Sequence, residues 1–86
     1  MIFRDKKEAV YILTIYFSET HENSFYFRSA EKLKDALVSL QDEKPCIELG
    51  NYIVFKRRIK IVHCLGQREY LKTEIAQIES QGTLIE

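Results

Sequence analysis

The feature that most constrains the fold of this chain is an apolar run at residues 9–18. Alternate side chains of a strand point to opposite faces. One face would carry Ala9, Tyr11, Leu13, Ile15 and Phe17, and the other Val10, Ile12, Thr14, Tyr16 and Ser18. Neither face is polar, which is typical of a strand in the middle of a sheet with both faces covered. We expect the protein's own helices to cover one face and a partner to cover the other.

The length and charge of the chain limit its class. Its 86 residues predict a single domain spanning residues 1–86, with a small stability margin. The 13 basic and 13 acidic residues balance, so no overall field attracts nucleic acid or an anionic membrane. Residues 1–8 are too charged for a signal-peptide core, and residues 10–17 are too few to cross a bilayer. We therefore expect a cytoplasmic protein with no membrane partner, whose Cys46 and Cys64 are free thiols.

The first half of the chain predicts a hairpin followed by a helix. A polar loop at residues 19–23 separates the first strand from a second strand at residues 24–28. Ser29 is a good helix N-cap, and Pro45 prevents the helix from continuing. Between them, apolar residues recur at spacings of three and four, the pattern of a helix packed on a sheet. These residues are Ala30, Leu33, Ala36, Leu37 and Leu40.

The second half predicts another hairpin and another helix. Residues 46–49 and 52–55 read as strands joined by a tight turn at Gly50 and Asn51. The strand then either continues to Cys64 or bends at residues 56–58 before a separate strand at 59–64, and we favour the bend slightly. Gly66 should end the strand region, and residues 67–80 should form the second helix, closed by Gly82.

The predicted fold follows from this order of elements, ββαββ(β)α. We expect an α+β two-layer sandwich, in which an antiparallel sheet of four to five strands carries both helices on one face. The pattern is too general to indicate a particular family.

Four basic residues, Lys56, Arg57, Arg58 and Lys60, form the most suggestive cluster. On a continuous strand, alternate members would project from one face about 6.6 Å apart, beside Tyr52. Such spacing suits an extended phosphate backbone, with the tyrosine as a stacking surface. The balanced total charge of the chain instead favours a simpler interpretation, in which the strand is solvated and its lysines and arginines prevent edge pairing.

No pattern in the sequence indicates an enzyme, a cofactor or a metal site. His21 lies between two glutamates in a loop, which is too few ligands for a closed metal site. His63 and Cys64 are neighbours on a strand, so they point to opposite faces and cannot share a proton directly. The chain also lacks a glycine-rich phosphate loop and a nucleophile elbow.

The aromatic residues of the first hairpin indicate an interface. Tyrosine is enriched where one side of a ring is apolar and its hydroxyl is wet. We therefore expect a non-enzymatic protein-binding module, a regulator, adaptor or inhibitor of a larger complex, that acts through an aromatic sheet surface as a homodimer. The alternative is a nucleic-acid or nucleotide binder that uses the basic cluster. The expected partner-binding residues are Tyr11, Tyr16, Tyr26, Lys56, Arg57, Arg58 and Lys60.

Overall fold

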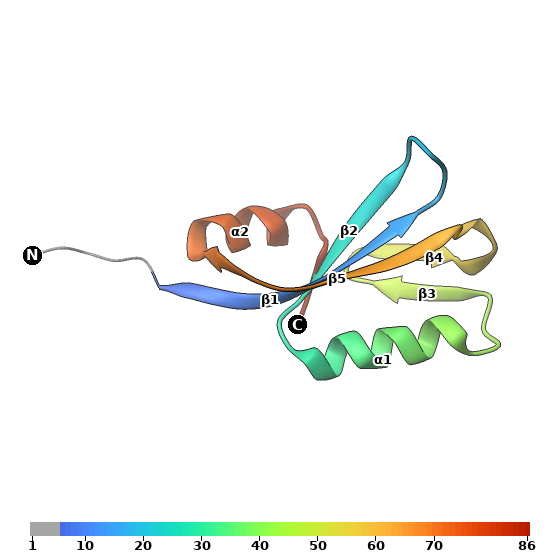
Figure 1. Ribbon diagram of the computed structural model, residues 1–86, viewed down its shortest axis with the longest axis horizontal. Helices are drawn as coiled ribbons and strands as arrows, with labels where there is room; N and C mark the ends of the chain where they lie inside the picture. Colours follow the sequence, from blue (N-terminus) through green and yellow to red (C-terminus); the bar gives the residue numbers. More distant parts are fainter. Residues whose placement is uncertain (1–5) are drawn as a thin grey trace, which may run out of the picture.

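The computed structural model describes residues 6–86, which form a four-stranded sheet, a separate two-stranded hairpin and two helices (Figure 1). The four-stranded sheet has the order β5-β1-β2-β6. Its strands are β1 (Lys7–Tyr16), β2 (Glu22–Phe27), β5 (Ile61–Leu71) and β6 (Leu84–Ile85). β1 pairs antiparallel with β2 and β5, whereas β6 pairs parallel with β2. The other elements are α1 (Ala30–Gln41), β3 (Cys46–Leu49), β4 (Tyr52–Phe55), the 3₁₀ turn η1 (Lys56–Arg58) and α2 (Lys72–Ser80).

The predicted α+β two-layer class and the order ββαββ(β)α are confirmed. Three local predictions are confirmed as well. Ser29 caps α1, since its Oγ accepts a hydrogen bond from the Lys32 N–H at 3.2 Å. Gly50 makes the turn between β3 and β4 with a φ of 59°. The chain bends at η1 and does not run straight from β4 into β5.

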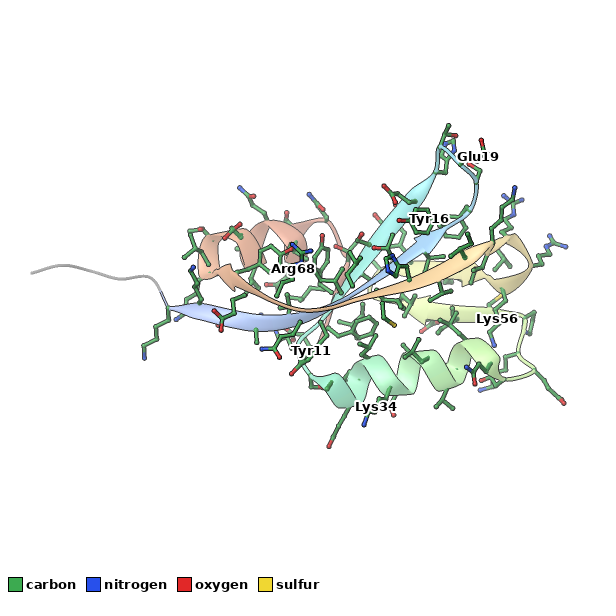
Figure 2. The ribbon with its side chains drawn as sticks, viewed as in Figure 1. Tyr11, Tyr16, Glu19, Lys34, Lys56 and Arg68 are labelled. Carbon is green, nitrogen blue, oxygen red and sulfur yellow. The ribbon has the colours of Figure 1, made fainter. Side chains whose placement is uncertain are left out.

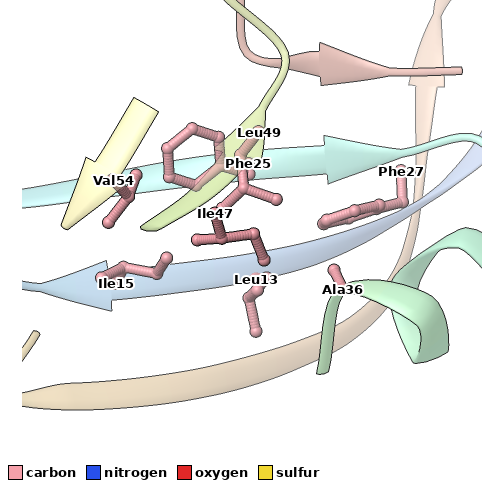
Figure 3. Packing of buried hydrophobic residues seen from close by; sticks show 8 residues of the cluster. All are labelled: Leu13, Ile15, Phe25, Phe27, Ala36, Ile47, Leu49 and Val54. Carbon is pink, nitrogen blue, oxygen red and sulfur yellow. The ribbon is translucent and has the colours of Figure 1, made fainter. Parts of the chain in front are cut away.

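Both faces of β1 are covered by this chain itself. Val10 and Ile12 pack against Ile75 and Ile78 of α2. A larger cluster on the other face joins β1 and β2 to α1 and the β3-β4 hairpin (Figure 3). Its buried members are Leu13, Ile15, Phe25, Phe27, Ala36, Ile47, Leu49 and Val54. Since neighbouring residues of a strand point to opposite faces, α1 and α2 lie on opposite sides of the sheet.

This arrangement corrects two details of the predicted sandwich. The helices do not share one face, because α1 and α2 pack on opposite faces of β1. This chain itself therefore covers both faces of the strand, one of which we expected a partner to cover. The strands also do not form a single antiparallel sheet. β3 and β4 pair only with each other among the described residues, and β6 makes the main sheet mixed. Where α2 packs on the sheet, the helix and the sheet form two layers. Where α1 and the β3-β4 hairpin pack on it, they and the sheet again form two layers.

The largest error in the prediction concerns residues 66–71. We expected Gly66 to end the strand region and a helix to begin at Gln67, but β5 continues to Leu71. Gly66 has a φ of 87°, and the pairing with β1 shifts register there, which is a β-bulge. β1 begins at Lys7, earlier than predicted, so its first residues supply the pairing partners of residues 67–71. The helix starts afterwards, where the Glu74 carboxylate accepts from the Leu71 N–H at 3.0 Å.

The C-terminal residues connect the two hairpins. Leu84 and Ile85 pair with the end of β2. The Tyr26 N–H donates to the Thr83 carbonyl at 2.9 Å, and the Asn51 N–H donates to the Gly82 carbonyl at 2.8 Å. The end of the chain therefore holds the β3-β4 turn beside the main sheet.

Candidate functional site

β5 is an edge strand whose outer side has no partner among residues 6–86. It has 11 residues, and every residue from Ile61 to Glu69 is exposed. Ile61 is 61% exposed, Leu65 41% and Val62 37%. An open edge of this kind offers unpaired N–H and C=O groups, together with apolar side chains, to another strand.

The bulge at Gly66 divides this edge into two chemically different parts. Before it, residues 61–65 read Ile-Val-His-Cys-Leu, with apolar side chains at both ends. After it, Gln67, Arg68 and Glu69 are polar or charged. Charged side chains are the usual protection of an edge strand, and here they occupy only the second part. Residues 61–65, which we call the open edge, are therefore the part suited to pairing.

The three tyrosines expected to bind a partner do not form one surface. Tyr11 packs against the cluster beneath α1, and Tyr26 packs on the other face against the cluster beneath α2. The ring of Tyr26 meets Tyr70 edge to face, with centroids 6.1 Å apart, and burial raises the pKa of Tyr26. Tyr16 lies farther along β1, on the opposite side from Tyr11 (Figure 2). A hydrogen bond to the Glu22 carboxylate and the charge of that carboxylate raise the pKa of Tyr16.

The basic cluster is divided by the bend at η1. The Lys56 ammonium pairs with the Asp42 carboxylate at the end of α1 and also donates to the Asp42 carbonyl at 3.1 Å. The hydrogen bond from Lys56 lowers the pKa of Asp42, so the pairing stabilises the fold at neutral pH and is lost as the pH falls through that lowered pKa. Arg57, Arg58 and Lys60 are exposed and, within the described part of the chain, pair with no carboxylate.

These three unpaired cations line a groove of about 790 Å³. The tip of the β1-β2 hairpin forms one wall of the groove, and β4 together with η1 forms the other. Its other lining residues are Phe17, Ser18, His21, Asn23, Tyr52, Ile53, Val54 and Phe55. None of these described lining residues is an aspartate or a glutamate. The groove thus combines aromatic rings with uncompensated positive charge, and it contains Tyr52, which we had placed beside the cluster from the sequence.

The histidines and cysteines of the described residues form neither a disulfide nor a metal-ligand cluster. His21 belongs to a polar turn, in which the Ser18 Oγ accepts from the Thr20 and His21 N–H groups at 3.3 and 3.1 Å. Cys46 and Cys64 are free thiols, and Cys64 is exposed on β5. Among residues 6–86, no three His, Cys, Asp or Glu side chains gather closely enough to hold a metal ion. None of the helices in that range is long and apolar enough to cross a bilayer.

Sequence reasoning missed the open edge and two rings of the groove. β5 is an edge because it pairs with β1 alone among the described strands, and no local pattern indicates this long-range pairing. The sequence placed Phe17 among the aromatic residues of the first hairpin and Phe55 on a separate strand. That both line one groove depends on how the two hairpins pack. In comparisons with known proteins, no family model, no curated protein and no solved structure matches this chain.

Proposed function

We propose that this chain is a non-enzymatic protein-binding module that works as a homodimer, and that the open edge of β5 is the surface through which it self-associates. The observation that carries the proposal is a long edge strand whose apolar side chains, Ile61, Val62 and Leu65, are exposed. Strand addition supplies partners for the unpaired main-chain groups of such an edge and covers its side chains in the same step.

The sequence of the open edge favours a second copy of the same strand as its partner. Two identical strands can pair antiparallel about a two-fold axis, which makes the contact self-complementary. If the axis passes at His63, Val62 lies opposite Cys64 of the second copy. Ile61 then lies nearest its Leu65, the residue that the bulge leaves out of the pairing with β1. Every cross-strand pair other than the central one is then apolar, which stabilises an antiparallel ladder. The net charge of zero adds no overall repulsion between the copies.

The test is the solution mass, measured by light scattering behind a sizing column. We expect the unaltered protein to have about twice the mass of its 10.2 kDa chain. The double substitution of Ile61→Lys with Leu65→Lys places like charges across the axis and should give a monomer. Both side chains are exposed, so we expect the far-ultraviolet circular dichroism spectrum to be retained.

Val38→Lys is the matched control, because Val38 is 67% exposed on α1 and lies outside the open edge. This variant should remain a dimer. A monomeric unaltered protein, or a dimer that persists in the Ile61/Leu65 double variant, would contradict the proposal.

A further inference from the structure

The groove beside η1 is a second surface that self-association through the open edge does not explain. Its position is set by main-chain hydrogen bonds at both ends of the bend. The Lys56 N–H donates to the Pro45 carbonyl at 2.9 Å, and the Lys60 N–H donates to the Tyr16 carbonyl at 2.8 Å. The segment that carries Arg57 and Arg58 is thereby anchored to the β3-β4 hairpin on one side and to the end of β1 on the other.

The charge of the groove is strongly one-sided although the whole chain is neutral. Arg57, Arg58 and Lys60 contribute three positive charges, and the described lining includes no carboxylate. The nearest member of the cluster, Lys56, is already paired with Asp42 and is absent from the groove lining. Unpaired cations that gather in one hollow attract an anionic ligand, and a neutral chain permits such a local field.

Three aromatic rings line the same hollow. Tyr52 is 41% exposed and Phe55 48%, and the half-buried Phe17 lines the hollow from the end of the first hairpin. The ring of Tyr52 is held in place, since it meets Phe25 edge to face at 5.9 Å and its hydroxyl donates to the Gln81 carbonyl at 3.2 Å. Rings that are positioned and exposed beside cations provide the two elements that single-stranded nucleic acids require, stacking surfaces for bases and charges for phosphates.

We propose that this groove binds single-stranded nucleic acid, with Arg57, Arg58 and Lys60 at the phosphates and Phe17, Tyr52 and Phe55 against the bases. A duplex keeps its bases stacked inside and leaves the rings unused. An inorganic anion leaves them unused as well, whereas an acidic peptide would satisfy the cations without needing flat stacking surfaces.

The experiment is a fluorescence-anisotropy titration with a fluorescein-labelled oligodeoxythymidine of about ten nucleotides, repeated at several salt concentrations. Three phosphate contacts on a single strand predict a slope of about −2 for the logarithm of the binding constant against the logarithm of salt concentration. A tenfold rise in salt should therefore weaken binding about a hundredfold.

Three variants separate the phosphate contacts of the groove, the general charge of the protein and the stacking of bases. The Arg57→Gln, Arg58→Gln pair removes two contacts and should reduce the slope to about −0.7. The Lys32→Gln, Lys34→Gln pair removes the same charge from the exposed side of α1 and should leave both affinity and slope unchanged. Phe55→Leu should weaken binding about tenfold while leaving the slope intact, since it removes a stacking surface and no charge.

Several results would overturn the proposal. The first is that the unaltered protein does not bind the oligonucleotide, and the second is that the Lys32/Lys34 pair weakens binding as much as the Arg57/Arg58 pair does. The third is that Phe55→Leu binds with unchanged affinity, and the fourth is that a labelled oligoglutamate binds as tightly as the oligonucleotide. Circular dichroism checks the fold of each variant, and Lys60→Gln replaces the arginine pair if that pair fails to fold. The dimer mass is measured without nucleic acid, so this proposal and the proposed function can fail separately.

Discussion

Two glycines with similar backbone angles show how the surroundings of a residue determine what it tolerates. Gly50 and Gly66 have φ values of 59° and 87°, both in the left-handed region that disfavours side chains. A Cβ on Gly50 would lie 2.2 Å from the carbonyl oxygen of Gly82, whereas a Cβ on Gly66 would have nothing within 4 Å. Gly50 is therefore required both by its conformation and by the close approach of the C-terminal segment.

We expect Gly66→Ala to lower the free energy of unfolding by about 1–2 kcal/mol, the cost of placing a side chain in left-handed geometry. Gly50→Ala should lower the free energy of unfolding by more than this, because the added Cβ would clash with the Gly82 carbonyl oxygen. Moving that backbone away would disturb the contact between the β3-β4 hairpin and the C-terminal segment. Urea denaturation followed by circular dichroism, at one protein concentration, measures both changes. Equal losses in the two variants would show that the close approach at Gly50 contributes nothing.

Among the elements, α1 has the clearest local start signal. The Ser29 side chain satisfies the Lys32 N–H, one of the groups that the first turn of a helix leaves without a partner. We expect Ser29→Ala to lower the free energy of unfolding by about 1 kcal/mol. Ser29→Asp keeps an acceptor at the cap and should retain most of the stability, as judged from urea midpoints. If Ser29→Asp loses as much stability as Ser29→Ala, the cap hydrogen bond is not the stabilising contact.

The elements that were predicted correctly are those with such local signals. The Ser29 cap, the Gly50 turn and the bend at η1 each depend on a few adjacent residues. The predicted boundary between β5 and α2 was wrong, because residues 67–71 form a strand by pairing with residues 7–11 of β1. That pairing supplies hydrogen bonds that no pattern within residues 67–80 reveals.

At the scale of the whole molecule, β1 links the two hydrophobic clusters. Ile12 is buried in the cluster under α2, and its neighbour Leu13 is buried in the cluster under α1. Loss of either cluster exposes one face of the same strand. The two ends of this elongated molecule should therefore unfold together in one transition.

Ile47→Ala in β3 and Ile75→Ala in α2 test this coupling, because each shortens a buried side chain in a different cluster. Each should lower the free energy of unfolding by about 2–5 kcal/mol. Transitions followed by circular dichroism and by tyrosine fluorescence should coincide in both variants. Separate transitions, with one end of the molecule melting before the other, would refute the coupling.

The sequence by itself determined the central strand, the first helix, the second hairpin and the class of fold. Those features depend on side-chain period, caps and turns, which act over a few residues. Only the tertiary structure decided which faces the helices cover, that β5 is an open edge, and that the groove cations meet three aromatic rings. Each of these depends on which distant segments pair, and pairing is selected by the combined burial and hydrogen bonding of the whole chain.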